Sequence, residues 1–192
     1  MKIIRLISAM FIVFGLSPSQ TIDLGQDLFF NNEGDIVLCV DAALAVRTLD
    51  RPYVMFMMYM GSKSQGGLSV HRDDVVMVYK GQEYQMPPLD EWRKEYKSAN
   101  HDVEVYQRLG KETLAQSQMR FWQFRWDYDF FPVLGKGSLP ADQLSMSGNI
   151  GARSKVYFKN PGFQNGDELV IKVKDHKKPD LIGYCAVVLN SK

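Results

Sequence analysis

The sequence predicts a mainly β fold, an antiparallel β-sandwich with a short helical insertion around residues 88–110. Three observations support this fold class. Apolar runs of strand length recur along the chain, turn-forming residues such as Asn165-Gly166 separate them, and the runs do not alternate regularly with helices. The 45% hydrophobic content is that of a globular protein. Residues 20–192 are therefore expected to form a single β-rich domain.

Strands are expected where apolar runs lie between turn residues. Residues 54–60 are apolar throughout, which indicates burial on both faces of the strand. Residues 75–79 and 82–86 flank Lys80-Gly81 and predict a β-hairpin, because glycine tolerates the positive φ of a tight turn. Further strands are expected at residues 35–46, 121–131, 155–158, 168–173 and 181–189.

The insertion shows helical periodicity. Leu89, Trp92 and Tyr96 recur at spacings of three and four, so they share one face of a short helix. Asp102 can cap a second helical stretch, which Gly110 ends. We expect these helices to pack on one edge of the sandwich.

Residues 1–19 are typical of a signal peptide. Lys2 and Arg5 form a charged start, an apolar stretch follows, and Ser17 and Ser19 place small residues ahead of a cleavage site. The apolar stretch is shorter than the roughly 20 residues that a spanning helix needs. We therefore expect a cleaved signal, a secreted or periplasmic protein, and no transmembrane segment after signal removal.

The charge balance restricts the partners. The chain has 23 Lys and Arg against 22 Asp and Glu, a formal net charge of +1. This balance provides no basic footprint for nucleic acid, so nucleic acid is not an expected partner. An unidentified protein or a glycan is expected instead, and no motif implies a cofactor.

No residue pattern points to a catalytic centre or a metal site. His71, His101 and His176 are scattered and lack the spacing of zinc motifs, and neither GxSxG nor SxxK occurs. The methionines of residues 54–60 could supply soft ligands for Cu(I). Alternation sends them to opposite faces of the strand and no histidine is near, so we expect core packing.

The two cysteines, Cys39 and Cys185, lie in apolar runs near the two ends of the exported part. In an oxidising compartment such a pair predicts a disulfide, which would make the first and last long strands neighbours. The alternative is a pair of buried free thiols.

Aromatic and polar residues alternate between positions 122 and 130. At period two, one face of a strand carries the rings of Trp122, Phe124, Trp126, Tyr128 and Phe130. The other face carries Gln123, Arg125, Asp127 and Asp129. Because an exposed row of rings is an unusually large apolar patch, we expect the rings to form sandwich core. The alternative is a stacking platform for sugar rings, in which Trp122, Trp126 and Tyr128 are the candidate ligand-binding residues.

The segment around Cys185 resembles the second cysteine strand of immunoglobulin domains. It departs from that pattern at Gly183, which stands where the immunoglobulin fold has a tyrosine, and no tryptophan follows Cys39 at the expected interval. No family is assigned on this segment, and an immunoglobulin-like architecture stays open.

These observations predict a binding or assembly role for an exported β-sandwich, at the cell envelope or outside the cell. A carbohydrate-binding module that uses the aromatic strand face is one alternative. A hydrolase with a dispersed active site is the other, with the charged residues near His71, or those on the face carrying Asp127 and Asp129, as its best candidates.

Overall fold

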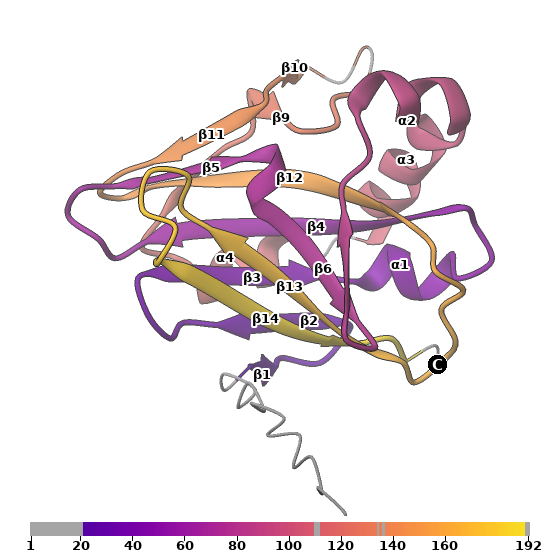
Figure 1. Ribbon diagram of the computed structural model, residues 1–192, viewed down its shortest axis with the longest axis horizontal. Helices are drawn as coiled ribbons and strands as arrows, with labels where there is room; N and C mark the ends of the chain where they lie inside the picture. Colours follow the sequence, from indigo (N-terminus) through magenta and orange to yellow (C-terminus); the bar gives the residue numbers. More distant parts are fainter. Residues whose placement is uncertain (1–20, 110–111, 134, 136, 191–192) are drawn as a thin grey trace, which may run out of the picture.

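The computed structural model describes residues 21–109, 112–133, 135 and 137–190. The predicted signal peptide, residues 1–19, lies outside this part of the chain. The mainly β class is confirmed, because the described chain forms several sheets, mostly antiparallel, and a few short helices in a sandwich-like arrangement (Figure 1).

A six-stranded sheet with the order β1-β2-β3-β4-β12-β8 forms the centre of the molecule. Its strands are β1 (Ile22–Asp23), β2 (Leu28–Asn31), β3 (Ile36–Asp41), β4 (Tyr53–Ser62), β12 (Ile150–Lys159) and β8 (Gln123–Arg125). All ten residues of β4 are buried, which confirms the burial of this strand on both faces. The edge strand β8 pairs with β12 in parallel, while the other neighbours in this sheet are antiparallel.

A four-stranded sheet with the order β14-β13-β6-β7 packs on one face of the six-stranded sheet. Its strands are β14 (Ile182–Val188), β13 (Glu168–Lys174), β6 (Val75–Tyr79) and β7 (Gln82–Gln85). The predicted hairpin of β6 and β7 is confirmed, with positive φ at Lys80 and Gly81. The two sheets approach closely where Gly183 meets Ile36, because a β-carbon on this glycine would lie 2.7 Å from Cγ2 of Ile36.

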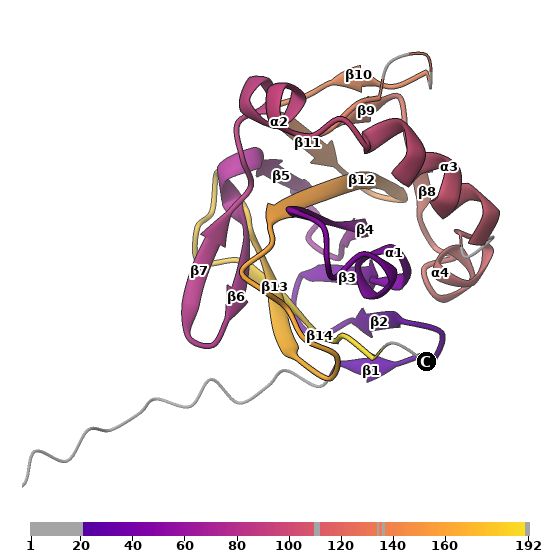
Figure 2. The ribbon, with the colours of Figure 1, turned by 90° about the vertical axis from the view of Figure 1, so that its right-hand side faces the viewer.

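Four short helices of the described chain surround the six-stranded sheet, namely α1 (Ala43–Arg47), α2 (Leu89–Glu95), α3 (Ala99–Leu109) and α4 (Glu112–Gln118). Helices α3 and α4 lie on the side of this sheet away from the four-stranded sheet (Figure 2). Asp102 of α3 joins the helices to the sheet, since its carboxylate accepts hydrogen bonds from the hydroxyls of Tyr96 (2.7 Å) and Tyr157 (3.2 Å) and pairs with Arg51. Burial raises the pKa of this carboxyl group.

Two of the expected strands are several residues shorter than predicted. The strand expected at residues 35–46 ends at Asp41, whose carboxylate accepts a hydrogen bond from the backbone N–H of Ala43 (2.9 Å) at the start of α1. The strand expected at residues 121–131 is broken into β8 and the two-residue β9 (Tyr128–Asp129). This second difference determines the candidate site.

Two small pairs of strands complete the fold. Strand β9 pairs in parallel with β10 (Leu139–Pro140), and β5 (Leu68–His71) pairs antiparallel with β11 (Gln143–Met146). A 3-10 turn, η1 (Arg72–Asp74), follows β5 directly. None of the helices in the described ranges is long and apolar enough to cross a membrane.

The predicted disulfide is absent from the structure. Cys39 on β3 and Cys185 on β14 are both free thiols and both fully buried, on strands that pack against each other. Burial raises the pKa of Cys39 to about 12, and it raises that of Cys185 as well. The prediction rested on compartment alone, whereas in the structure the pair packs as two small apolar side chains, the alternative considered for the sequence.

Candidate functional site

The rings of Trp122 and Phe124 lie over two glycines of the central sheet. A β-carbon at Gly61 of β4 would lie 2.6 Å from Cδ2 of Trp122, and one at Gly151 of β12 would lie 2.8 Å from Cε1 of Phe124. Only glycine leaves room for rings this close to the backbone. The aromatic segment is thereby fixed on the sheet at its N-terminal end.

Trp126 and Tyr128 are exposed, which corrects the expectation that all five rings form core. Trp126 is 61% exposed and Tyr128 is 44% exposed, whereas Phe130 is fully buried. The period of two fails because Trp126 and Asp127 lie between two strands instead of within one. Of the three candidate ligand-binding residues, Trp126 and Tyr128 face solvent and Trp122 is half-buried.

An ion pair lies beside the exposed ring of Tyr128. Nη2 of Arg125 donates a hydrogen bond to Oδ2 of Asp127 (2.9 Å), and the guanidinium carbon lies 5.9 Å from the centre of the Tyr128 ring. The hydrogen bond from Arg125 lowers the pKa of Asp127, so this carboxylate stays ionised in weak acid. The arrangement places donors, an acceptor and the Tyr128 ring together at the surface, and the exposed Trp126 belongs to the same segment.

Asp129 fixes the C-terminal end of the same segment, and it corrects the expectation that Asp127 and Asp129 share an exposed face. Its buried carboxylate pairs with Nζ of Lys155 and accepts hydrogen bonds from Ser154 Oγ and from the backbone N–H of Phe131, both 3.0 Å. The N–H of Phe130 in turn donates to Ser154 Oγ (3.0 Å). Residues 126–128 are thus held between two fixed ends.

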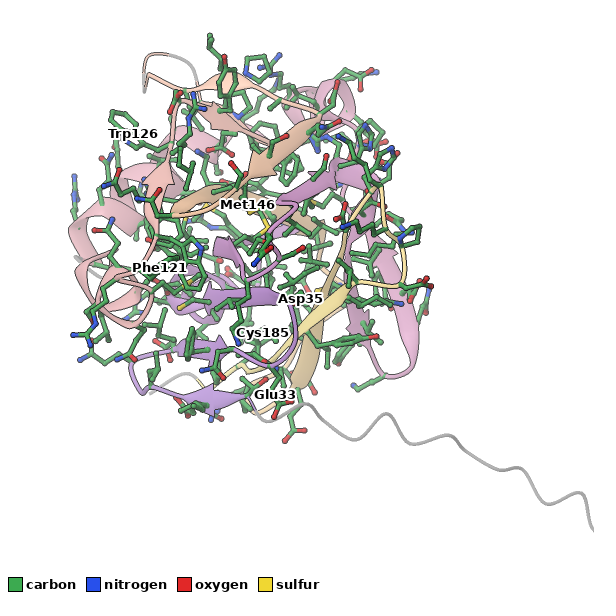
Figure 3. All side chains as sticks on the ribbon, turned by 90° about the vertical axis from the view of Figure 1, so that its left-hand side faces the viewer. Glu33, Asp35, Phe121, Trp126, Met146 and Cys185 are labelled. Carbon is green, nitrogen blue, oxygen red and sulfur yellow. The ribbon has the colours of Figure 1, made fainter. Side chains whose placement is uncertain are left out.

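Most of the exposed large apolar side chains of the described chain gather near this segment. They are Phe121, Trp126, Tyr128, Leu139 and Ile150, and we call these five residues the aromatic patch. Leu139 is the pairing partner of Tyr128, and Ile150 that of Gln123 in β8. Trp126 and Phe121 lie at the same margin of the molecule, whereas Cys185 lies toward its middle (Figure 3). Ile22, on β1 at the opposite edge of the six-stranded sheet from β8, is the other exposed side chain of this class among the described residues.

Sequence reasoning missed three members of the patch. Leu139 and Ile150 are isolated apolar residues among polar and glycine neighbours, and nothing local marks them as neighbours of Tyr128 or β8. Phe121 was expected inside a strand, but the turn before β8 leaves it at the surface. Pairing between segments far apart in sequence creates this surface.

A second group of polar residues comes together around Asp74 of η1. Its carboxylate accepts a hydrogen bond from the N–H of His71 (3.2 Å), lies 2.8 Å from Nδ1 of His176 and pairs with Nζ of Lys174 (3.5 Å). The two imidazole rings are 5.1 Å apart. The connection between β13 and β14 brings His176 to β5, where its N–H donates to the carbonyl of Ser69 (2.7 Å).

This group contains the residue types of an acid–base site, but in the part of the chain that the structure describes it lacks the hydrogen bond between a nucleophile and a histidine that such a site uses. Asp74 orients His176 as a carboxylate orients a catalytic base. The hydroxyl of Ser69 is buried and has no hydrogen-bond partner within the described chain. His101 lies elsewhere, exposed on α3. Among the described residues no three His, Cys, Asp or Glu side chains are placed to hold a metal ion.

Comparison with known proteins gives no further guide to function, since no family model, no curated protein and no solved structure matches this chain.

Proposed function

We propose that this protein is exported and acts by binding, and that the aromatic patch is its binding surface. One observation carries the proposal: five exposed large apolar side chains belong to residues 121–128 or to the strand-pairing partners of this segment, which is held at its two ends by Gly61 and Gly151 and by Asp129. Large exposed apolar patches are uncommon on monomeric proteins and typically mark a binding surface. A segment that is already ordered loses little conformational freedom when a ligand binds.

The binding role is tested by capture from the cell-envelope fraction of the source organism. The immobilised protein is compared with two variants, Trp126→Ser in the patch and Ile22→Ser outside it, which matches the first in removing one exposed apolar side chain. We expect the same envelope component on the wild type and on Ile22→Ser, and its loss on Trp126→Ser. Equal retention on all three proteins would remove the patch as the binding surface.

Export is tested separately, on the protein recovered outside the cytosol. If residues 1–19 are a signal peptide, the intact mass and the first residue determined by chemical sequencing correspond to a chain that begins at Gln20. A full-length chain confined to the cytosol would contradict export.

A hydrolase centred on His176 is the second candidate function. It is favoured by the 2.8 Å contact between His176 and Asp74, which leaves the other ring nitrogen available to accept a proton. A screen with ester, amide, glycoside and phosphate-ester substrates tests it, with His176→Asn as the control. Activity that disappears in this variant supports catalysis, and equal rates for both proteins reject it.

A further inference from the structure

We propose that Arg125, Trp126, Asp127 and Tyr128 form a carbohydrate subsite, in which a pyranose ring stacks on the aromatic side chains and hydrogen-bonds to the ion pair. This inference rests on the binding role proposed above and names its ligand class. It follows from two observations. Arg125 is hydrogen-bonded to Asp127 and lies over the ring of Tyr128, and Trp126, which lies between Arg125 and Asp127 in sequence, is exposed.

The rings suit one side of a sugar. A pyranose exposes C–H groups on its faces and hydroxyls around its rim, so it needs an apolar platform below and polar groups beside it. Trp126 and Tyr128 offer exposed aromatic surface for the C–H groups. Each carries its own polar tip, the indole N–H and the phenol hydroxyl, which further hydroxyls can reach.

The ion pair suits the rim of the sugar. Arg125 has five N–H donors in a planar fork, and its contact with Asp127 leaves several of them directed to solvent. Asp127 keeps acceptor capacity on both carboxylate oxygens. Because each partner holds the other, the donors and the acceptor are in place before a ligand arrives.

The same ion pair makes a protein partner the weaker explanation for this subsite. The centre of a protein–protein interface is depleted of charged residues, and burying an ion pair there removes its water. Here both members of the pair are exposed, and they alternate with the two rings in sequence. A sugar that stacks on the rings leaves one side of the ion pair open to water. On the other side, its hydroxyls replace the water molecules that the ion pair loses.

Titration with soluble oligosaccharides tests the inference. The panel consists of hexasaccharides of β-1,4-linked glucose, xylose, mannose and N-acetylglucosamine, and binding is followed by calorimetry. We expect at least one to bind the wild-type protein, with affinity weakened about tenfold or more by Trp126→Ala and by Arg125→Gln. Trp126→Phe, which keeps a ring, should retain part of the affinity.

A control variant outside the patch separates the subsite from a general loss of surface hydrophobicity. Ile22→Ser removes one exposed apolar side chain on β1, at the far edge of the central sheet, so it should keep the sugar affinity. Sugar binding that survives Trp126→Ala would overturn the subsite. If no hexasaccharide binds while envelope capture still depends on Trp126, the ligand class is wrong and the binding role stands. If capture is independent of Trp126 as well, both proposals fall.

Discussion

Trp122 packs directly on the backbone of Gly61, and this contact separates two tryptophans that are four residues apart in sequence. Trp122 is drawn onto the central sheet, while Trp126 lies beyond the end of β8 and is exposed. The position of one glycine therefore determines which ring becomes part of the fold and which is left for a ligand.

Substituting Gly61 with alanine should destabilise the protein by about 1–3 kcal/mol, because the new β-carbon forces the Trp122 ring out of its place. Urea unfolding measures the change. Gly66→Ala is the matched control, since its β-carbon meets only side-chain ends, Nζ of Lys178 at 3.3 Å and Oγ of Ser64 at 3.9 Å. Equal midpoints for the two variants would show that the ring does not rest on Gly61.

Trp126→Ala should leave the free energy of unfolding within about 0.5 kcal/mol of the wild type, since the ring is exposed. Phe130→Ala should cost about 3–5 kcal/mol, because Phe130 is fully buried in the same segment. The pair of variants is compared by chemical denaturation. A large loss for Trp126→Ala would place this ring in the core, as the alternating pattern first suggested.

Asp129→Asn should cost about 3–5 kcal/mol, because it leaves Lys155 buried without a counter-ion. Lys155→Met added to this variant should recover a large part of the loss, since no unpaired charge then remains in the interior. Urea unfolding of the single and the double variant measures both. A double variant that is less stable than Asp129→Asn would contradict the unpaired charge of Lys155 as the cause of the loss.

The thiols should resist alkylation in the native state. Only the thiolate reacts, and burial raises the pKa of Cys39 to about 12, so little thiolate exists at pH 8. Iodoacetamide should label two cysteines after denaturation and none before it, as read by intact mass. A mass about 2 Da below the dithiol value would instead show the disulfide that the sequence suggested.

Stability should fall as the pH rises above 9. An unfolded Cys39 loses its proton near pH 9, whereas the folded thiol keeps it up to about pH 12, so the native state binds more protons between these values and rising pH favours unfolding. Cys39→Ala should have a shallower decline of the melting temperature over this range. Parallel curves for the two proteins would mean that the thiol is not buried as described.

Local signals predicted much of the fold. Periodicity and turn chemistry are informative over a few residues, and they predicted three features. These are the buried strand β4, the turn at Lys80-Gly81, and the helix that carries Leu89 and Trp92 with Tyr96 at its end. The break between β8 and β9 could not be predicted from such local signals. It depends on Asp129, whose partners lie on β12 and are distant in sequence.

The candidate site was predicted only in part. Trp126 and Tyr128 were named from the sequence, but their exposure depends on where the strand breaks and on the glycines of the central sheet beneath the segment. The approach of His176 to His71 was invisible for the same reason, because a connection between two strands of another sheet creates it.

The most direct test uses the indole N–H signals of the three tryptophans in a two-dimensional NMR spectrum. Trp92 is buried, Trp122 is half-buried on the sheet and Trp126 is exposed, so the three signals report on three environments. On addition of an oligosaccharide that binds in calorimetry, we expect the Trp126 signal to shift most and the Trp92 signal to stay in place. A Trp126 signal that does not move while the sugar is bound would contradict the account.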